Sequence, residues 1–179
     1  MTAENIVLCG FMGCGKSTVG RLLAAGLTRP FLDTDAVIEQ ETGLTIPQLF
    51  AQNGEADFRA REREVCRRLA MPQGRVVAVG GGTLMDSGNT AALRAGGVVV
   101  HLYVPIDILL DRLQGDTHRP LLARPDWRQA ARDLYARRLP LYRAAADAEI
   151  DARGPAKAVA DAVQTAVGTV LTMRQSHQA

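Results

Sequence analysis

The chain has 179 residues, of which 47% are hydrophobic, and this is enough apolar material for one domain with a sizeable core. Its formal net charge is only +2 and its aromatic content is 4%, so neither bulk charge nor base stacking argues for a nucleic-acid partner. No apolar run approaches the ~18 residues of a membrane span, and the N-terminus lacks the pattern of a signal peptide.

The first predicted elements are a strand over Ile6–Cys9 and a helix that begins near Lys16. The segment Gly10–Thr18 runs from the end of this strand into the start of the helix. It fits G-x-x-x-x-G-K-[ST], the phosphate-binding loop. A strand before this loop and a helix after it are the context that the motif requires. An ordinary glycine-rich turn before a helix is the simpler alternative, but it does not require this spacing.

Each residue type in this loop suits a bound polyphosphate. Glycines such as Gly13 and Gly15 let the backbone curl around phosphate oxygens, and the helix N-terminus attracts the anion. Lys16 can reach the β- and γ-phosphates, and the Ser17 hydroxyl can bind Mg²⁺ directly. Cys14 is either a small filler or a redox-sensitive thiol, since a helix N-terminus lowers a thiol pKa. The motif thus predicts a nucleoside triphosphate with Mg²⁺.

The rest of the chain alternates short apolar runs with helical patterns, which predicts βαβ units and a parallel sheet buried on both faces. Further strands are predicted at Phe31–Leu32, Val76–Val79, Val98–Leu102 and Glu149–Ile150. Helices are predicted from about Ala36 to Glu41, from Thr45, from Glu55 to Leu69, from Pro105 to Leu113, from Trp127 to Ala145 and from Pro155 to Val170. We expect the tail after Met173 to fray.

Two segments of the single predicted domain, residues 1–179, depart from this alternation. Residues 33–70 are too long for one crossover, and we expect this insertion to bind a second substrate. Residues 114–126 are polar, with glycine and proline, and are typical of a mobile lid. Arg119 in this lid could stabilise charge on the transferring phosphate, although an ordinary loop arginine would look the same.

Two motifs follow predicted strands, at the sheet edge where ligands bind in such folds. If strand geometry persists, Asp33 and Asp35 point the same way, so one could hold Mg²⁺ through water while the other accepts a proton. The alternative is a solvated turn or a helix N-cap. Gly80–Gly82 would allow close backbone approach to a ligand, or would be a flexible turn.

Two arginines, Arg59 and Arg138, lie in predicted helices and could grip a carboxylate bidentately. Surface ion pairs with Glu62, Glu64 or Asp133 are equally open from the residues alone. Three cysteines without metal or disulfide spacing are typical of reduced thiols in the cytoplasm.

Taken in order, these motifs resemble the shikimate kinase family over about Ile6 to Pro155. The resemblance rests on Gly10–Gly20, Asp33–Asp35, Gly54–Glu55, Phe58–Arg59 with Glu62, Gly80–Gly82, Arg119–Leu122 and Arg138–Tyr142. It implies a three-layer α/β/α fold of the P-loop NTPase type, with a five-stranded parallel sheet and a lid. It also implies transfer of the ATP γ-phosphate to the 3-hydroxyl of shikimate, in aromatic amino-acid biosynthesis.

The resemblance further assigns roles to residues. Lys16, Asp35 and Arg119 would be catalytic, and Ser17 would bind Mg²⁺ directly, with Asp33 acting through water. Shikimate would be bound by Asp35, Arg59, Gly81, Gly82 and Arg138. ATP would be bound by Gly13, Cys14, Gly15, Lys16, Ser17, Thr18, Arg112, Arg119 and Arg153. We expect a cytoplasmic monomer whose partner is this small-molecule substrate, with no nucleic acid or membrane.

Two rival functions remain for test. A kinase of the same fold could phosphorylate another hydroxy acid such as gluconate, since the aspartate pair and the two arginines suit any hydroxylated carboxylate. A regulatory module that binds nucleotide without chemistry would be expected to lack Lys16, Asp35 or an arginine, and all are present.

Overall fold

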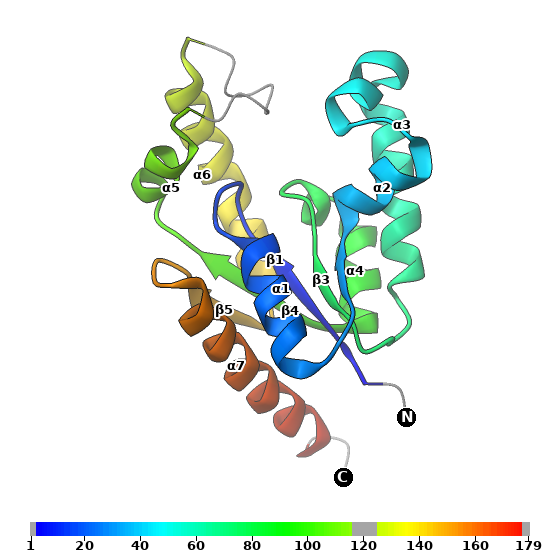
Figure 1. Ribbon diagram of the computed structural model, residues 1–179, viewed down its shortest axis with the longest axis vertical. Helices are drawn as coiled ribbons and strands as arrows, with labels where there is room; N and C mark the ends of the chain where they lie inside the picture. Colours follow the sequence, from blue (N-terminus) through cyan, green and yellow to red (C-terminus); the bar gives the residue numbers. More distant parts are fainter. Residues whose placement is uncertain (1–2, 116–124, 177–179) are drawn as a thin grey trace.

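Five parallel strands form the centre of the molecule, in the order β2-β3-β1-β4-β5 (Figure 1). The computed structural model describes residues 3–115 and 125–176. Its strands are β1 (Asn5–Cys9), β2 (Phe31–Asp33), β3 (Val76–Ala78), β4 (Gly97–Tyr103) and β5 (Ala148–Asp151). Every pairing between neighbouring strands is parallel, and Ile6 of central β1 lies opposite both Val76 and Val98. The predicted parallel sheet is confirmed.

Helices cover both faces of this sheet, so the three-layer architecture is confirmed (Figure 1). In Figure 1, α1 and α7 lie side by side in front of the sheet, and α4 and α6 lie behind it. The helices are α1 (Lys16–Leu27), α2 (Thr34–Thr42), α3 (Ile46–Arg68), α4 (Ser87–Gly96), α5 (Ile106–Leu113), α6 (Trp127–Ala145) and α7 (Ala156–Ser176), with a 3₁₀ turn η1 (Thr83–Met85). Within the described ranges, no helix has the length and apolarity to cross a bilayer.

The core is built on the three central strands, as their valine content predicts. Val7, Val77 and Val99 are fully buried, because helices cover both of their faces. Burial of such side chains is the main favourable contribution to folding, at about 25 cal/mol per Å² of apolar surface. This rigid centre fixes the carboxyl ends of β1, β2 and β3 relative to one another.

The insertion between β2 and β3 folds as α2 and α3. The side chain of Thr45 accepts a hydrogen bond from the N–H of Gln48, which begins α3 with a capping box. Gly54, with φ of 82°, interrupts the helix, and the charged helical piece then continues to Arg68. The two helices predicted from Thr45 and from Glu55 are therefore the two halves of a kinked α3.

Two sequence-based expectations need correction. The helix α4 was not predicted, because its glycines and small residues weaken the apolar pattern; its start is marked only by Asp86, which accepts from the N–H groups of Gly88 and Asn89. The C-terminal helix was predicted to end near Val170 with a fraying tail, yet α7 reaches Ser176. Arg174 explains the difference, since its guanidinium donates to Glu4 Oε2 at 2.7 Å.

A glycine at the end of α4 offers a direct test of packing. A Cβ on Gly96 would lie 1.8 Å from the carbonyl oxygen of Leu69, so backbone must move to admit alanine. We expect Gly96→Ala to lower the free energy of unfolding by about 2–3 kcal/mol, measured by urea denaturation. The matched control is Gly26→Ala in α1, where nothing lies within 4 Å of the added methyl group. Alanine there should stabilise by about 0.5–1 kcal/mol; equal effects at both positions would contradict this view of the packing.

Candidate active site

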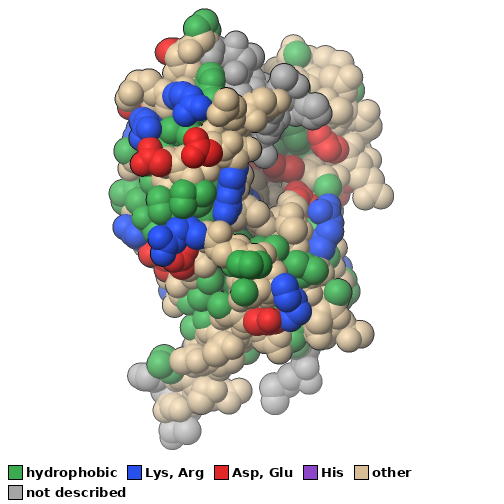
Figure 2. Space-filling view, turned by 60° about the vertical axis from the view of Figure 1, so that its left-hand side comes forward, with side chains coloured by type: hydrophobic (Ala, Val, Ile, Leu, Met, Phe, Trp, Pro, Cys, Tyr) green, Lys and Arg blue, Asp and Glu red, His purple; other side chains and the backbone are tan. Residues whose placement is uncertain are grey.

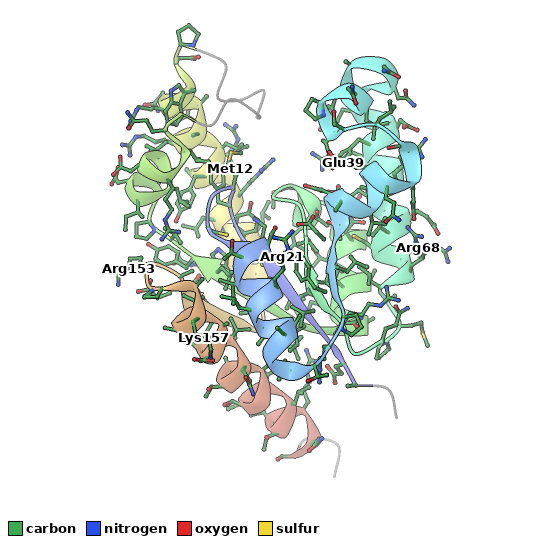
Figure 3. All side chains as sticks on the ribbon, in the orientation of Figure 1. Met12, Arg21, Glu39, Arg68, Arg153 and Lys157 are labelled. Atoms are coloured by element: carbon green, nitrogen blue, oxygen red, sulfur yellow. The ribbon has the colours of Figure 1, made fainter. Side chains whose placement is uncertain are left out.

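A cavity of about 520 Å³ opens at the carboxyl ends of β1, β2 and β3. Figure 2 shows a hollow between the two upper parts of the molecule, with acidic side chains visible inside it. Met12, on the loop after β1, and Glu39, on α2, lie on opposite sides of this opening (Figure 3). The lining residues are Met12, Gly13, Gly15, Lys16, Ser17, Thr18, Asp33, Asp35, Ala36, Glu39, Ala78, Val79, Gly80, Gly81 and Arg138. The structure thus brings together the phosphate loop, the aspartate pair, Arg138 and the glycine segment, which is Gly80–Gly82.

The phosphate loop turns sharply between β1 and α1. Gly15, at φ of 97°, is the N-cap of α1, and Gly10 lies so close to Leu102 that a Cβ would be 2.8 Å from its carbonyl oxygen. Both positions therefore require glycine. Lys16 Nζ donates to the carbonyl of Gly10 at 2.8 Å and to that of Phe11 at 3.2 Å. The loop holds its lysine against its own backbone, beside the cavity.

Asp33 caps α2 and also contacts the phosphate loop, so of the alternatives left open by the sequence the helix N-cap is observed. Its Oδ1 accepts from the N–H groups of Asp35 and Ala36, so it is the N-cap of α2. Its Oδ2 accepts the Ser17 hydroxyl at 2.8 Å, which ties it to the phosphate loop. The expectation that strand alternation points both aspartates the same way is wrong, because β2 ends at Asp33 and Asp35 lies in the first turn of α2. Asp35 nevertheless lines the same cavity.

Asp35 presents a buried carboxyl group to this site. Its Oδ1 is buried and has no hydrogen-bond partner among the described residues, and a Cβ on Gly80 would lie 2.8 Å from it. Burial, and then the nearby carboxylates of Asp33 and Glu62, raise the pKa of Asp35 from 3.8 to about 6. A carboxyl group with a pKa near neutrality, in a polar cavity, is suited to accept a proton.

Arg59 is oriented by two acids of its own helix. Its Nη1 donates to Glu62 Oε2 at 2.8 Å, and its Nε donates to Glu55 Oε1 at 3.3 Å. Glu62 is only 1% exposed, and its other oxygen accepts the Thr83 hydroxyl at 2.7 Å. The ion pair with Glu62, one of the open alternatives, therefore exists, and it fixes the guanidinium beside Gly82, whose added Cβ would be 3.0 Å from Arg59 Nη1.

Arg138 reaches the same glycine from α6. A Cβ on Gly82 would lie 3.3 Å from Arg138 Nη2, so the two guanidinium groups converge on one backbone position. Arg59, Gly82 and Arg138 line a second cavity of about 510 Å³, and Arg138 also lines the first. Among the described residues, no carboxylate lies within ion-pair distance of Arg138. A cation without an anionic partner next to a second arginine is a suitable site for a carboxylate ligand.

Arg112 links the phosphate loop to the segment after β5. Its Nη1 donates to the carbonyl of Gly13 at 3.3 Å, and its Nη2 donates to the carbonyl of Arg153 at 3.3 Å. The Arg153 side chain is exposed and pairs with Asp151. The structure thus brings the two expected adenine-side arginines together. Arg119, expected to act from the lid, lies outside the described residues.

A family model described as Shikimate kinase matches residues 12–167, which is most of the chain. The chain belongs to the shikimate kinase family. A shikimate kinase from Stenotrophomonas maltophilia (strain K279a) is 45% identical over 149 residues, or 83% of each chain. The family resemblance read from the motifs is confirmed, and this protein is an ATP-dependent kinase.

Solved structures of the family superpose closely on this kinase. A shikimate kinase from Acinetobacter baumannii, in complex with shikimate, gives a TM-score of 0.86 with 42% identity, covering 96% of this chain and 94% of its own. A gluconokinase from Sinorhizobium meliloti 1021 gives a TM-score of 0.57 with 20% identity, over 99% of this chain and 97% of its own. The second likeness shows a shared fold alone.

Several residues at the site of this kinase have no role in the sequence-based assignment. The Thr34 hydroxyl accepts the N–H of Gly80 at 3.2 Å, and Glu39 lines the cavity one helical turn after Asp35. Thr83 holds Glu62, and Tyr142 donates its hydroxyl to the carbonyl of Gly81 at 2.5 Å. Thr34 and Tyr142 lie inside quoted motifs, so their position was available, but their contacts depend on elements that are distant along the chain.

Proposed function

We propose that this kinase transfers the γ-phosphoryl group of ATP to the 3-hydroxyl of shikimate, giving shikimate 3-phosphate for aromatic amino-acid biosynthesis. The observation that carries the proposal is the buried carboxyl group of Asp35, whose Oδ1 has no hydrogen-bond partner among the described residues, in the same cavity as the phosphate loop and Arg138. Its raised pKa suits it to take a proton. A phosphate site, a proton acceptor and an anion site in one hollow support a hydroxylated acid as the second substrate.

The proposed reaction is an in-line displacement. The 3-hydroxyl oxygen forms a bond to the γ-phosphorus while the bond from that phosphorus to the bridging oxygen of ADP breaks. Asp35 orients the hydroxyl and accepts its proton. Lys16 leaves its carbonyl partners to neutralise charge on the β- and γ-phosphates, supported by the N–H groups of Gly13, Gly15 and Thr18 and the backbone of Cys14. Because the protein contributes little covalent chemistry, the rate depends on positioning and charge.

The substrate acid is held, in this proposal, on the opposite side of the cavity. Arg59 and Arg138 bind its carboxylate bidentately, and the Gly81 and Gly82 backbone donates to it. The convergence of both guanidinium groups on Gly82 supports this clamp. Residues 33–70 contribute Arg59 and Glu62 to the second cavity and Asp35 to the first, which supports their assignment as the substrate-binding insertion. Residues 114–126, with Arg119, would close over the phosphates and exclude water.

The residues around Ser17 fit Mg²⁺. A hydroxyl and a carboxylate 2.8 Å apart, beside the phosphate loop, match a cation that takes one or two protein oxygens together with waters and substrate phosphates. Ser17 would bind it directly and Asp33 through water, and the ion would neutralise phosphate charge. Arg112 and Arg153 are the proposed adenine-side contacts, supported by their link to Gly13. We further propose a cytoplasmic monomer that engages neither nucleic acid nor membrane.

A coupled kinase assay tests this function. Purified protein with ATP and Mg²⁺ is offered shikimate, gluconate and nucleoside monophosphates separately, and ³¹P NMR locates the new ester. We expect turnover of shikimate alone, a 3-phosphate product, and loss of turnover on chelation that added Mg²⁺ reverses. Turnover of gluconate without turnover of shikimate would assign the protein to the rival hydroxy-acid kinase, and tight nucleotide binding with no acceptor would favour the regulatory module.

A further inference from the structure

The hydroxyl of Tyr142 holds one backbone carbonyl of the glycine segment. Tyr142 lies on α6 and is only 1% exposed, and its hydroxyl donates to the Gly81 carbonyl at 2.5 Å. The ring of His101 packs against it with centroids 5.2 Å apart, and His101 is itself held by Glu149 at 2.9 Å. The phenol ring is therefore held by packing against His101 as well as at its hydroxyl.

Gly81 lies close both to Arg138 and to the phosphate loop. A Cβ on Gly81 would lie 3.4 Å from Arg138 Nη1 and 3.8 Å from the carbonyl oxygen of Gly10. That same Gly10 carbonyl accepts Lys16 Nζ at 2.8 Å. A shift of Gly81 would therefore disturb Arg138 before the phosphate loop, because the Gly10 carbonyl lies farther away.

The hydrogen bonds of the segment leave its central amides open. The N–H of Gly80 donates to Thr34 Oγ1, and the N–H of Thr83 donates to the Gly80 carbonyl. Among the described residues, nothing accepts from the N–H of Gly81 or Gly82. The Gly81 carbonyl and the Gly82 N–H belong to one planar peptide unit and point in opposite directions. Fixing that carbonyl therefore also fixes the direction of the Gly82 N–H.

We propose that Tyr142 is a positioning residue for the acid substrate. Its hydroxyl fixes the Gly81–Gly82 peptide so that the Gly82 N–H and the Arg138 guanidinium present their donors to the same carboxylate. This proposal rests on the proposed function, because it needs a hydroxy acid in that half of the cavity. Burial also raises the pKa of Tyr142 and outweighs the opposing effect of the neighbouring Arg138, so the phenol is protonated and can donate near neutral pH.

Tyr142→Phe tests the proposal, since it removes the hydroxyl and keeps the ring. We expect the KM and the Kd for shikimate to rise roughly three- to tenfold, the equivalent of one hydrogen bond, while the KM for ATP changes less than about twofold. The matched control is Tyr135→Phe on the same helix, where another buried tyrosine donates its hydroxyl to the Val104 carbonyl at 3.0 Å, away from both cavities. Tyr135→Phe should lower the melting temperature about as much as Tyr142→Phe does, but it should leave the shikimate KM unaltered.

The outcomes separate the two proposals. The wild-type assay alone tests the function and identifies the acid that is phosphorylated, and Tyr142→Phe is then measured on that acid. A selective rise in its KM and Kd, absent from Tyr135→Phe, supports the positioning role. An unchanged KM, equal rises for the acid and ATP, or the same changes in both variants would overturn it while leaving the wild-type function intact.

Discussion

Asp35→Asn is expected to lower kcat for shikimate phosphorylation by about 10²–10⁴-fold, because the amide cannot accept the proton of the attacking hydroxyl. The Kd for ATP should stay within about threefold of the wild type, since Asp35 lies on α2 and its Oδ1 makes no hydrogen bond to any described residue, including those of the phosphate loop. Single-turnover kinetics and nucleotide titration measure the two quantities separately. An equal loss of ATP affinity would show that Asp35 acts mainly on the nucleotide.

The same substitution should stabilise the ligand-free protein. The pKa of Asp35 is raised from 3.8 to about 6, so the folded chain binds this proton more tightly than the unfolded chain does. The destabilisation is therefore absent below the unfolded pKa, grows as the pH rises between these values, and is complete above about 6. At pH 8 we expect Asp35→Asn to raise the free energy of unfolding by about 1–3 kcal/mol, at 1.36 kcal/mol per pKa unit. At pH 4 this increase in the free energy of unfolding should vanish. An increase of the same size at both pH values would show that the ionised carboxylate of Asp35 is not its cause.

A pH profile adds a kinetic check of the same group. Because Asp35 must be ionised to accept a proton, kcat/KM should fall as the pH drops through about 6. The matched control is Asp57→Asn, a half-buried carboxylate on α3 that lines neither cavity, pairs with Arg61 and has its pKa lowered by that hydrogen bond. Asp57→Asn should leave kcat and the fall of kcat/KM at low pH unchanged, and it should not raise the free energy of unfolding.

Arg59→Ala is expected to raise the KM for shikimate by about 10–100-fold with a smaller change in kcat. A charge-assisted hydrogen bond to the substrate carboxylate, worth about 1.5–3 kcal/mol, is lost from binding. Arg59→Lys should recover only part of the affinity, because an ammonium keeps the charge but not the planar fork. Steady-state kinetics with each substrate varied in turn measure this, and an unchanged shikimate KM would contradict the carboxylate clamp.

Arg59→Ala should also cost stability, for a reason unrelated to substrate. It leaves the Glu62 carboxylate, whose side chain is 2% exposed, without its cationic partner. Adding Glu62→Gln removes that uncompensated charge and should restore part of the unfolding free energy, but not the shikimate KM. Arg61→Ala, which breaks the partly exposed pair with Asp57, is the control; it should cost less unfolding free energy than Arg59→Ala and leave the shikimate KM unaltered. Recovery of both by Glu62→Gln would mean that the KM effect is structural.

Features that depend on neighbours along the chain were predictable from sequence. Gly10–Thr18 specifies its own conformation, because positive-φ glycines, a preceding buried strand and a following helix are all local. The valine-rich strands β1, β3 and β4 are likewise recognisable, since burial on both faces demands continuous apolar runs. The helix α4 was not predicted, because its glycines weaken the apolar pattern of a helix. Its position depends on the close packing of Gly96 against Leu69.

The arrangement of the site was decided by tertiary structure. Arg59 and Arg138 lie on separate helices, and only the fold brings both to Gly82. Asp35 was identified for its chemistry, yet the argument from strand alternation failed, because Asp33 ends β2 and caps α2. The burial that raises the pKa of Asp35, and the hydrogen bond that joins Tyr142 to Gly81, arise between residues far apart in the chain. The sequence by itself therefore determined which chemical groups are present and where the phosphate loop begins, while packing determined their distances, their desolvation and hence their reactivity.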